Sequence, residues 1–177
     1  MMQRSLAILL LLTLAGCHPP RKSITSAALL PTLSAPVVWP GLNARVVPPI
    51  GWRADPIKSS GSHQHQVWVS PSGSTAYGVI RFNLPLPVGA DLVLWGFLRE
   101  MRKSEGSAEL ISKAPDPDLP GLRFIAKGGR YTVRTNLTTR GFTGWAVYAG
   151  TLTNQSINQE ELAIAEAARE RTVVNSP

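Results

Sequence analysis

The sequence predicts an α+β domain in which a mostly antiparallel β-sheet of about five to six strands packs against one or two helices. Two observations predict this class. The elements follow one another as strands, a helix, more strands and a second helix, and neighbouring strands are joined by short turns. The length suits one domain, which we expect at residues 50–174, followed by a short tail at 175–177.

Short apolar and β-branched runs between turn residues predict the strands. The run 144–152 is apolar on both faces, so we expect it at the centre of the sheet. The first two runs are separated by Ser70-Pro71-Ser72-Gly73 and should form a hairpin. The expected strands are 66–69, 75–82, 108–113, 122–127 and 144–152.

Two segments carry helical patterns. The first, 91–104, has an apolar stripe on one side and ends before Gly106, which is a suitable stop. The second begins at Asn158, which forms a capping box with Glu161, and runs to about Arg171. The apolar stripe of the first helix is Leu94, Phe97, Leu98 and Met101.

The pair Gly128-Gly129 predicts a tight hairpin turn. If the hairpin is centred on this pair, Lys127 lies opposite Arg130 and Arg123 lies opposite Arg134. Like charges placed opposite one another are destabilising, so this face should meet water or an anion. We therefore take these four residues as a candidate anion-binding or partner-binding surface. The alternative is a solvated sheet edge whose charges discourage aggregation.

The N-terminus has the pattern of an export signal. Arg4 precedes the apolar run 6–12, and Leu14-Ala15-Gly16-Cys17 follows. This segment resembles the bacterial lipoprotein signal, and the resemblance implies that 1–16 are removed and that Cys17 is lipidated at the new N-terminus. The expected location is the bacterial cell envelope, anchored by lipid and facing the periplasm. His18 after the cysteine favours the outer over the inner membrane.

The segment 17–49 is rich in proline and shows little periodicity, which predicts a tether. An alternative stays open for two apolar stretches, Val37-Val38-Trp39 and Val46-Val47, which could dock on the domain. The formal charge of +7 falls by one when Arg4 is removed. The net positive charge suits binding to the membrane surface and to an anionic envelope polymer or protein. Export argues against nucleic acid as a partner.

Candidate catalytic or metal-binding residues are few. His63 and His65 would project to one face of a strand, and Asp116 and Asp118 alternate in a proline-rich loop. These four residues define the alternative function, a small metal-dependent or hydrolytic enzyme. No cysteine or nearby carboxylate completes a metal site, so we predict a non-enzymatic protein without a metal or cofactor.

The order of elements resembles the PsbP-like fold over residues 50–174. The shared features are the Pro49-to-Trp52 entry, the first hairpin, the helix at Asp91, the later hairpins and the terminal helix. The resemblance implies a non-enzymatic domain that binds another macromolecule or helps to assemble one. We therefore expect a lipid-anchored binding or scaffold domain for an envelope component.

Overall fold

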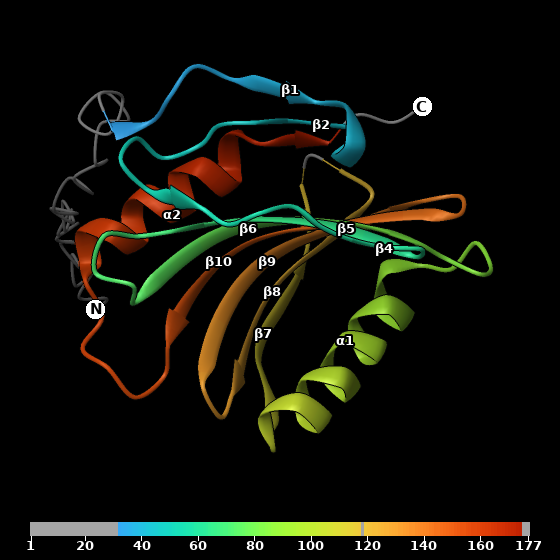
Figure 1. Ribbon diagram of the computed structural model, residues 1–177. Helices are drawn as coiled ribbons and strands as arrows, with labels where there is room; N and C mark the ends of the chain where they lie inside the picture. Colours follow the sequence, from blue (N-terminus) through green and yellow to red (C-terminus); the bar gives the residue numbers. More distant parts are fainter. Residues whose placement is uncertain (1–31, 118, 175–177) are drawn as a thin grey trace, which may run out of the picture.

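The computed structural model describes residues 32–117 and 119–174, which form two antiparallel sheets and two α-helices (Figure 1). The large sheet has eight strands in the order β3-β5-β6-β10-β9-β8-β7, with β4 paired to β5. The small sheet has the order β1-β2-β11. The elements are β1 (Val37–Trp39), a 3-10 turn (Pro40–Leu42), β2 (Ala44–Val46), β3 (Arg53–Ala54), β4 (Lys58–Ser60), β5 (His63–Val69), β6 (Thr75–Asn83), α1 (Ala90–Glu105), β7 (Ala108–Pro115), β8 (Gly121–Gly128), β9 (Tyr131–Arg140), β10 (Thr143–Leu152), α2 (Gln159–Arg171) and β11 (Val173–Val174).

The predicted fold class is therefore wrong in its proportion of strand to helix. We expected a sheet of about five to six strands, whereas the described residues form 11 strands in two antiparallel sheets and are mostly β. Five of the additional strands, β1 to β4 and β11, are only two or three residues long. Such short strands carry no readable alternation of apolar and polar residues, because their pairing is decided by neighbours distant in sequence.

The chain reaches the far edge of the large sheet through α1. After β6, which lies in the middle, α1 leads to β7 at the edge, and β7 to β10 then return strand by strand until β10 pairs with β6. The predicted central position of the 144–152 strand is confirmed, because β10 lies between β6 and β9.

The two faces of the large sheet carry different layers (Figure 1). On one face α2 and the small sheet cover β6 and β10, and their shared core includes Trp68, Tyr77 and Val147. On the other face α1 packs over β7, β8 and β9, and Phe124 and Leu137 lie in that core. Since α1 lies mainly over these strands and reaches only a few residues of β6 and β10, much of this face remains without a helix.

Residues 32–49, which we predicted to be part of a tether, pack on the domain. Leu42, Ala44 and Val46 are fully buried in the core beneath the small sheet. The indole Nε1 of Trp145 in β10 donates a hydrogen bond of 2.9 Å to the carbonyl oxygen of Leu42. The open alternative, that these apolar stretches dock, is the observed one, and the folded unit begins well before residue 50.

Both predicted helices are confirmed. Gly106 ends α1 in a left-handed conformation with φ of 79°. Asn158 caps α2, where its Oδ1 accepts hydrogen bonds from the amides of Glu160 and Glu161 at 3.1 and 3.2 Å. The carboxylate of Glu161 instead binds the β5–β6 turn, accepting hydrogen bonds from the amide and hydroxyl of Ser72 at 3.2 and 2.5 Å. Neither helix is both long and apolar enough to span a membrane within the described residues.

The predicted register of the β8–β9 hairpin is wrong by two residues. Lys127 pairs with Thr132, and Arg123 pairs with Asn136 instead of Arg134. The faces are nevertheless as expected, because a shift of two preserves the side of each side chain. The pair Gly128-Gly129 is needed for a different reason from the one assumed: a Cβ at Gly129 would overlap the carbonyl oxygen of Glu105 at the end of α1.

Candidate functional site

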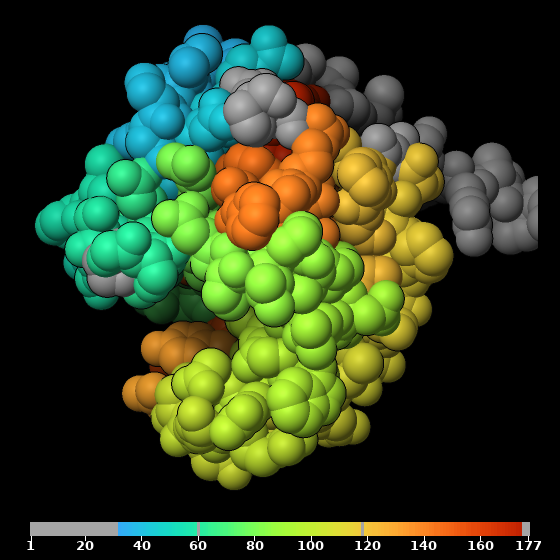
Figure 2. All heavy atoms as spheres, turned by 90° about the vertical axis from the view of Figure 1, so that its right-hand side faces the viewer, coloured from blue at the N-terminus to red at the C-terminus, as the bar shows by residue number. Residues whose placement is uncertain are grey.

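The face that α1 leaves uncovered forms a groove with a volume of about 620 Å³. In Figure 2 the surface is hollowed between the yellow-green helix α1 and the blue-green strands β4 and β5. Alternate side chains of β5, β6, β10 and β9 make its floor, and the C-terminal half of α1 makes one wall. The groove exists because one helix is too narrow to cover so broad a sheet.

The floor of the groove is apolar and built from small or β-branched side chains. These residues come from four adjacent strands, so their common side follows from the pairing register. Small side chains in the two central strands keep the groove deep. The apolar lining residues of the sheet are Val67, Val69, Ala76, Ile80, Val133, Ala146, Gly150 and Leu152.

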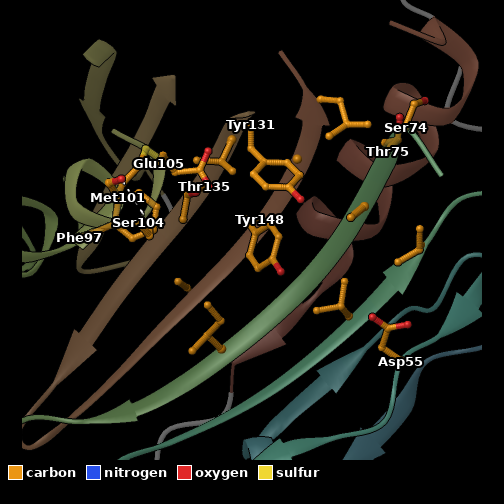
Figure 3. Close-up of a pocket in the computed structure, with 18 of the residues that line it drawn as sticks. Asp55, Ser74, Thr75, Phe97, Met101, Ser104, Glu105, Tyr131, Thr135 and Tyr148 are labelled. Atoms are coloured by element: carbon orange, nitrogen blue, oxygen red, sulfur yellow. Dashed lines mark hydrogen bonds between the residues drawn. The ribbon is translucent and has the colours of Figure 1, made fainter. Parts of the chain in front are cut away.

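Two aromatic side chains stand in the middle of the groove. Figure 3 shows Tyr131 and Tyr148 between Asp55 on one side and the α1 residues Met101 and Glu105 on the other. Tyr131 is 41% exposed, so its ring is available to a ligand. The Tyr148 ring lies over Gly78 of β6, where a Cβ would overlap the ring.

Tyr148 is held by a hydrogen bond to His65. The phenolic oxygen of Tyr148 lies 2.8 Å from Nε2 of His65. Burial, with the charge of Lys58 and the neighbouring His63, lowers the pKa of His65 to about 4, so His65 is neutral at pH 7. Burial also raises the pKa of Tyr148 above its ordinary value. The pair is therefore a neutral hydrogen-bonding unit rather than an ionised acid and base.

A second polar group faces the groove from β9. Thr135 is 1% exposed, and its Oγ1 has no hydrogen-bond partner among the residues that the structure describes. In the register of the sheet Thr135 lies directly opposite Tyr148 of β10. A buried hydroxyl without a partner is costly, so this group favours a ligand or water that satisfies it.

The carboxylates of the groove already have cationic partners. Glu105 lies 3.2 Å from Arg130, and Asp55 lies 3.4 Å from Arg53. Glu100 pairs with Lys103 at 2.7 Å. The hydrogen bond from Lys103 holds the pKa of Glu100 below its ordinary value. The walls therefore present little uncompensated charge to a ligand.

The four predicted basic residues do not form one surface. Arg130 pairs with Glu105 at the end of α1, and Lys127 is exposed. Arg123 and Arg134 do come together on the opposite face of the sheet from the groove, where Arg134 pairs with Glu166 of α2 at 3.0 Å. The sheet register thus keeps Arg123, Lys127 and Arg134 on one face, whereas the turn places Arg130 beside α1.

The predicted catalytic residues are also dispersed. His63 and His65 lie on β5, as expected, whereas Asp116 follows β7 at the other edge of the sheet. Four strands separate β5 from β7, which corresponds to roughly 24 Å at about 4.8 Å per strand. Asp118 and Cys17 lie outside the described residues. Within the described part of the chain no group of three or more His, Cys, Asp or Glu residues could hold a metal ion.

Sequence reasoning missed Tyr131, Tyr148 and Thr135 as groove residues. One signal was present, because β6 and β10 carry Gly78 and Gly150 within otherwise bulky strands. A glycine inside a strand often marks a place where another group approaches closely. Which side chain approaches Gly78 depends on the pairing of β6 with β10, and sequence alone did not supply that register.

Comparisons with known proteins show the fold. No family model matches the sequence, and no curated protein matches it either. The solution structure of cyanobacterial PsbP (CyanoP) from Synechocystis sp. PCC 6803 is similar with a TM-score of 0.59 and 14% identity, covering 81% of this chain and 93% of that one. A crystal structure from Bacteroides thetaiotaomicron VPI-5482 has a TM-score of 0.39 at 14% identity, over 79% of this chain and 48% of that one. The expected PsbP-like fold is thereby confirmed.

Proposed function

We propose that this protein is a lipid-anchored domain of the bacterial envelope that binds a largely apolar small molecule in its groove without chemically changing it. The observation that carries the proposal is the groove of about 620 Å³ on the face beside α1. Ligand pockets in proteins typically have volumes of about 300–1,000 Å³ and combine an apolar lining with a few polar groups.

The side chains that line the groove indicate what kind of molecule it would hold. Its floor is aliphatic, and its carboxylates are paired with cations, so an apolar body gains most by entering. Thr135 and the neutral pair of Tyr148 and His65 offer hydrogen bonds at fixed positions. The preferred ligand is therefore an acyl chain or ring system that carries one or two uncharged hydrogen-bonding groups.

The same geometry favours binding over catalysis. A general base needs a pKa near the working pH, and the pKa of His65 is lowered to about 4. The raised pKa of Tyr148 keeps its hydroxyl protonated. Asp116 lies at the opposite edge of the sheet and is too distant to assist either histidine of β5. The PsbP-like resemblance likewise implies a non-enzymatic domain.

The anchor is proposed from the sequence. The segment Leu14-Ala15-Gly16-Cys17 lies outside the described residues, and its likeness to a lipoprotein signal supports attachment through Cys17. The test is expression in a bacterium beside Cys17→Ala. A mature wild-type chain that begins at lipidated Cys17 and sediments with membranes, lost in the variant, supports the anchor. An unlipidated, soluble wild type removes it.

The groove is tested separately with the uncharged fluorophore phenylnaphthylamine. We expect saturable fluorescence enhancement with the wild type and at least tenfold weaker binding with Val69→Lys, because the new charge enters the apolar floor. The matched control is Val38→Lys on β1, where the native side chain is 64% exposed and distant from the groove. Absence of saturable binding to the wild type, or equal weakening by both variants, contradicts a groove site.

A further inference from the structure

A second recess lies on the opposite face of the large sheet, beside α2. It has a volume of about 270 Å³ and is bordered by β7, β8, β9 and one side of α2. Three arginines line it: Arg123 from β8, Arg134 from β9 and Arg169 from α2. They approach from three elements, so their proximity is a product of the fold and not of a local run of charge.

Arg134 has one guanidinium nitrogen in an ion pair and another without a hydrogen-bond partner among the described residues. Its Nε lies 3.0 Å from Oε1 of Glu166, and its side chain is 24% exposed. Its Nη1 is buried and has no hydrogen-bond partner among the described residues. A buried guanidinium N–H without an acceptor is unfavourable, because the group loses water and gains nothing in return.

Arg169 shows the same division. Its Nη2 lies 3.3 Å from Oε1 of Glu170, and its side chain is 11% exposed. Its Nε is buried, again without a hydrogen-bond partner in the part of the chain that the structure describes. Glu166 and Arg169 are three residues apart on α2, so both side chains point to the same side of the helix.

The other two cations of the recess are paired with carboxylates that lie outside its lining. Arg123 lies 3.4 Å from Asp116 through its Nε, with a side chain that is 38% exposed. Lys113 also borders the recess, but its Nζ is 2.7 Å from Asp91 of α1 on the other face of the sheet. Glu166 is the one carboxylate among the lining residues, and three of the other lining residues are arginines.

We propose that this recess binds a phosphate group, with the guanidinium groups of Arg134 and Arg169 as its principal donors. Guanidinium groups match the oxygens of phosphate in geometry and hold hydrogen bonds strengthened by charge. A space of about 270 Å³ admits one phosphate with some of its water but not a polymer chain. The recess and the groove lie on opposite faces, so this proposal stands independently of the groove ligand.

The test is a calorimetric titration of the full chain with inorganic phosphate. Chloride balances the phosphate so that the ionic strength stays constant. We expect saturable binding by the wild type and at least tenfold weaker binding by Arg169→Gln. The matched control is Arg99→Gln, an exposed arginine on α1 that stacks on Trp95 6.0 Å from the ring centre. Arg169→Lys, which keeps the charge but loses the Nε donor, provides a second variant should the first fail to fold.

The source of the phosphate group is distinguished with vesicles. Two proteins are compared, Cys17→Ala and the double variant Cys17→Ala with Arg169→Gln. Each is mixed with phosphatidylcholine vesicles that either contain or lack phosphatidic acid. Binding that needs phosphatidic acid, needs Arg169 and is competed by inorganic phosphate assigns the site to a lipid headgroup. Phosphate binding without vesicle binding assigns it to a soluble phosphate compound. The proposal is overturned if phosphate does not bind the wild type, or if the arginine variants bind it as the wild type does.

Discussion

The hydroxyl of Tyr148 lies 2.8 Å from Nε2 of His65, although the two residues are 83 positions apart in the chain. One is on β10 and the other on β5, with β6 between them. The contact spans β6 because Gly78 has no side chain to stand under the Tyr148 ring. The first hairpin is thereby tied to the centre of the sheet, and the groove acquires its neutral hydrogen-bonding pair.

The His65 contact predicts a loss of stability in mild acid. The folded-state pKa of about 4 lies below the ordinary value of 6.5, so between these values the unfolded chain binds more protons. The free energy of unfolding therefore falls as pH is lowered from about 6.5 to about 4. His65→Gln should flatten this slope in urea unfolding followed by tryptophan fluorescence. His63→Gln, at an exposed position two residues earlier, should keep most of it; an unchanged slope in His65→Gln contradicts the assignment.

Gly78→Ala should displace the Tyr148 ring. The added methyl would overlap that ring, and overpacking of this kind typically costs about 1–3 kcal/mol of unfolding free energy. The ring should swing into the groove and weaken phenylnaphthylamine binding. Gly150→Ala is the matched control on the same face, since its nearest contact would be Cγ1 of Val133 at an ordinary 3.6 Å. Equal stability of the two variants would show that the close approach has no consequence for folding.

Glu161→Gln should loosen α2 from the β5–β6 turn. Burial acts to raise the pKa of Glu161, but hydrogen bonds from Ser72, Ser70 and Ser74 outweigh it and hold the pKa below its ordinary value. Loss of the charge should lower the unfolding free energy by about 1–3 kcal/mol at pH 7. The depressed pKa means that the contribution is present above about pH 4.5 and disappears as pH falls through the folded-state value.

The control for this variant is Glu160→Gln, which removes an exposed charge from the same first turn of α2. Both substitutions alter the interaction with the helix dipole similarly, so the difference between them reports the contact with the turn. Equal unfolding midpoints in guanidinium chloride at pH 7 would show that the serine contacts contribute nothing.

Leu42→Ala tests whether residues 32–49 belong to the folded unit. Leu42 is 1% exposed, and large-to-small substitutions at such positions typically cost about 2–5 kcal/mol. The same substitution in a free tether would leave the free energy of unfolding unchanged. Val38→Ala, where the native side chain is 64% exposed, should remain within about 0.5 kcal/mol of the wild type in the same thermal unfolding measurement. Similar midpoints for the two variants would contradict the packing.

Patterns that repeat within a single element were readable from the sequence. The stripe from Leu94 to Met101 predicted α1, Asn158 predicted the start of α2, and the apolar run around Val147 predicted the central strand. Even in the hairpin with the wrong register, Phe124 and Arg123 were assigned to the correct opposite sides. Local periodicity is sufficient here because the geometry of one helix or strand repeats from residue to residue.

The groove and the arginine recess depended on the tertiary structure. Tyr148 meets His65, and Arg134 meets Arg169, only because strand pairing and helix packing bring distant segments together. Local patterns in the sequence were sufficient to predict the periodic elements, and composition alone gave the net positive charge. Tertiary structure decided the short strands, the register and every contact across the sheet, since these depend on which surfaces are buried together and not on any one segment.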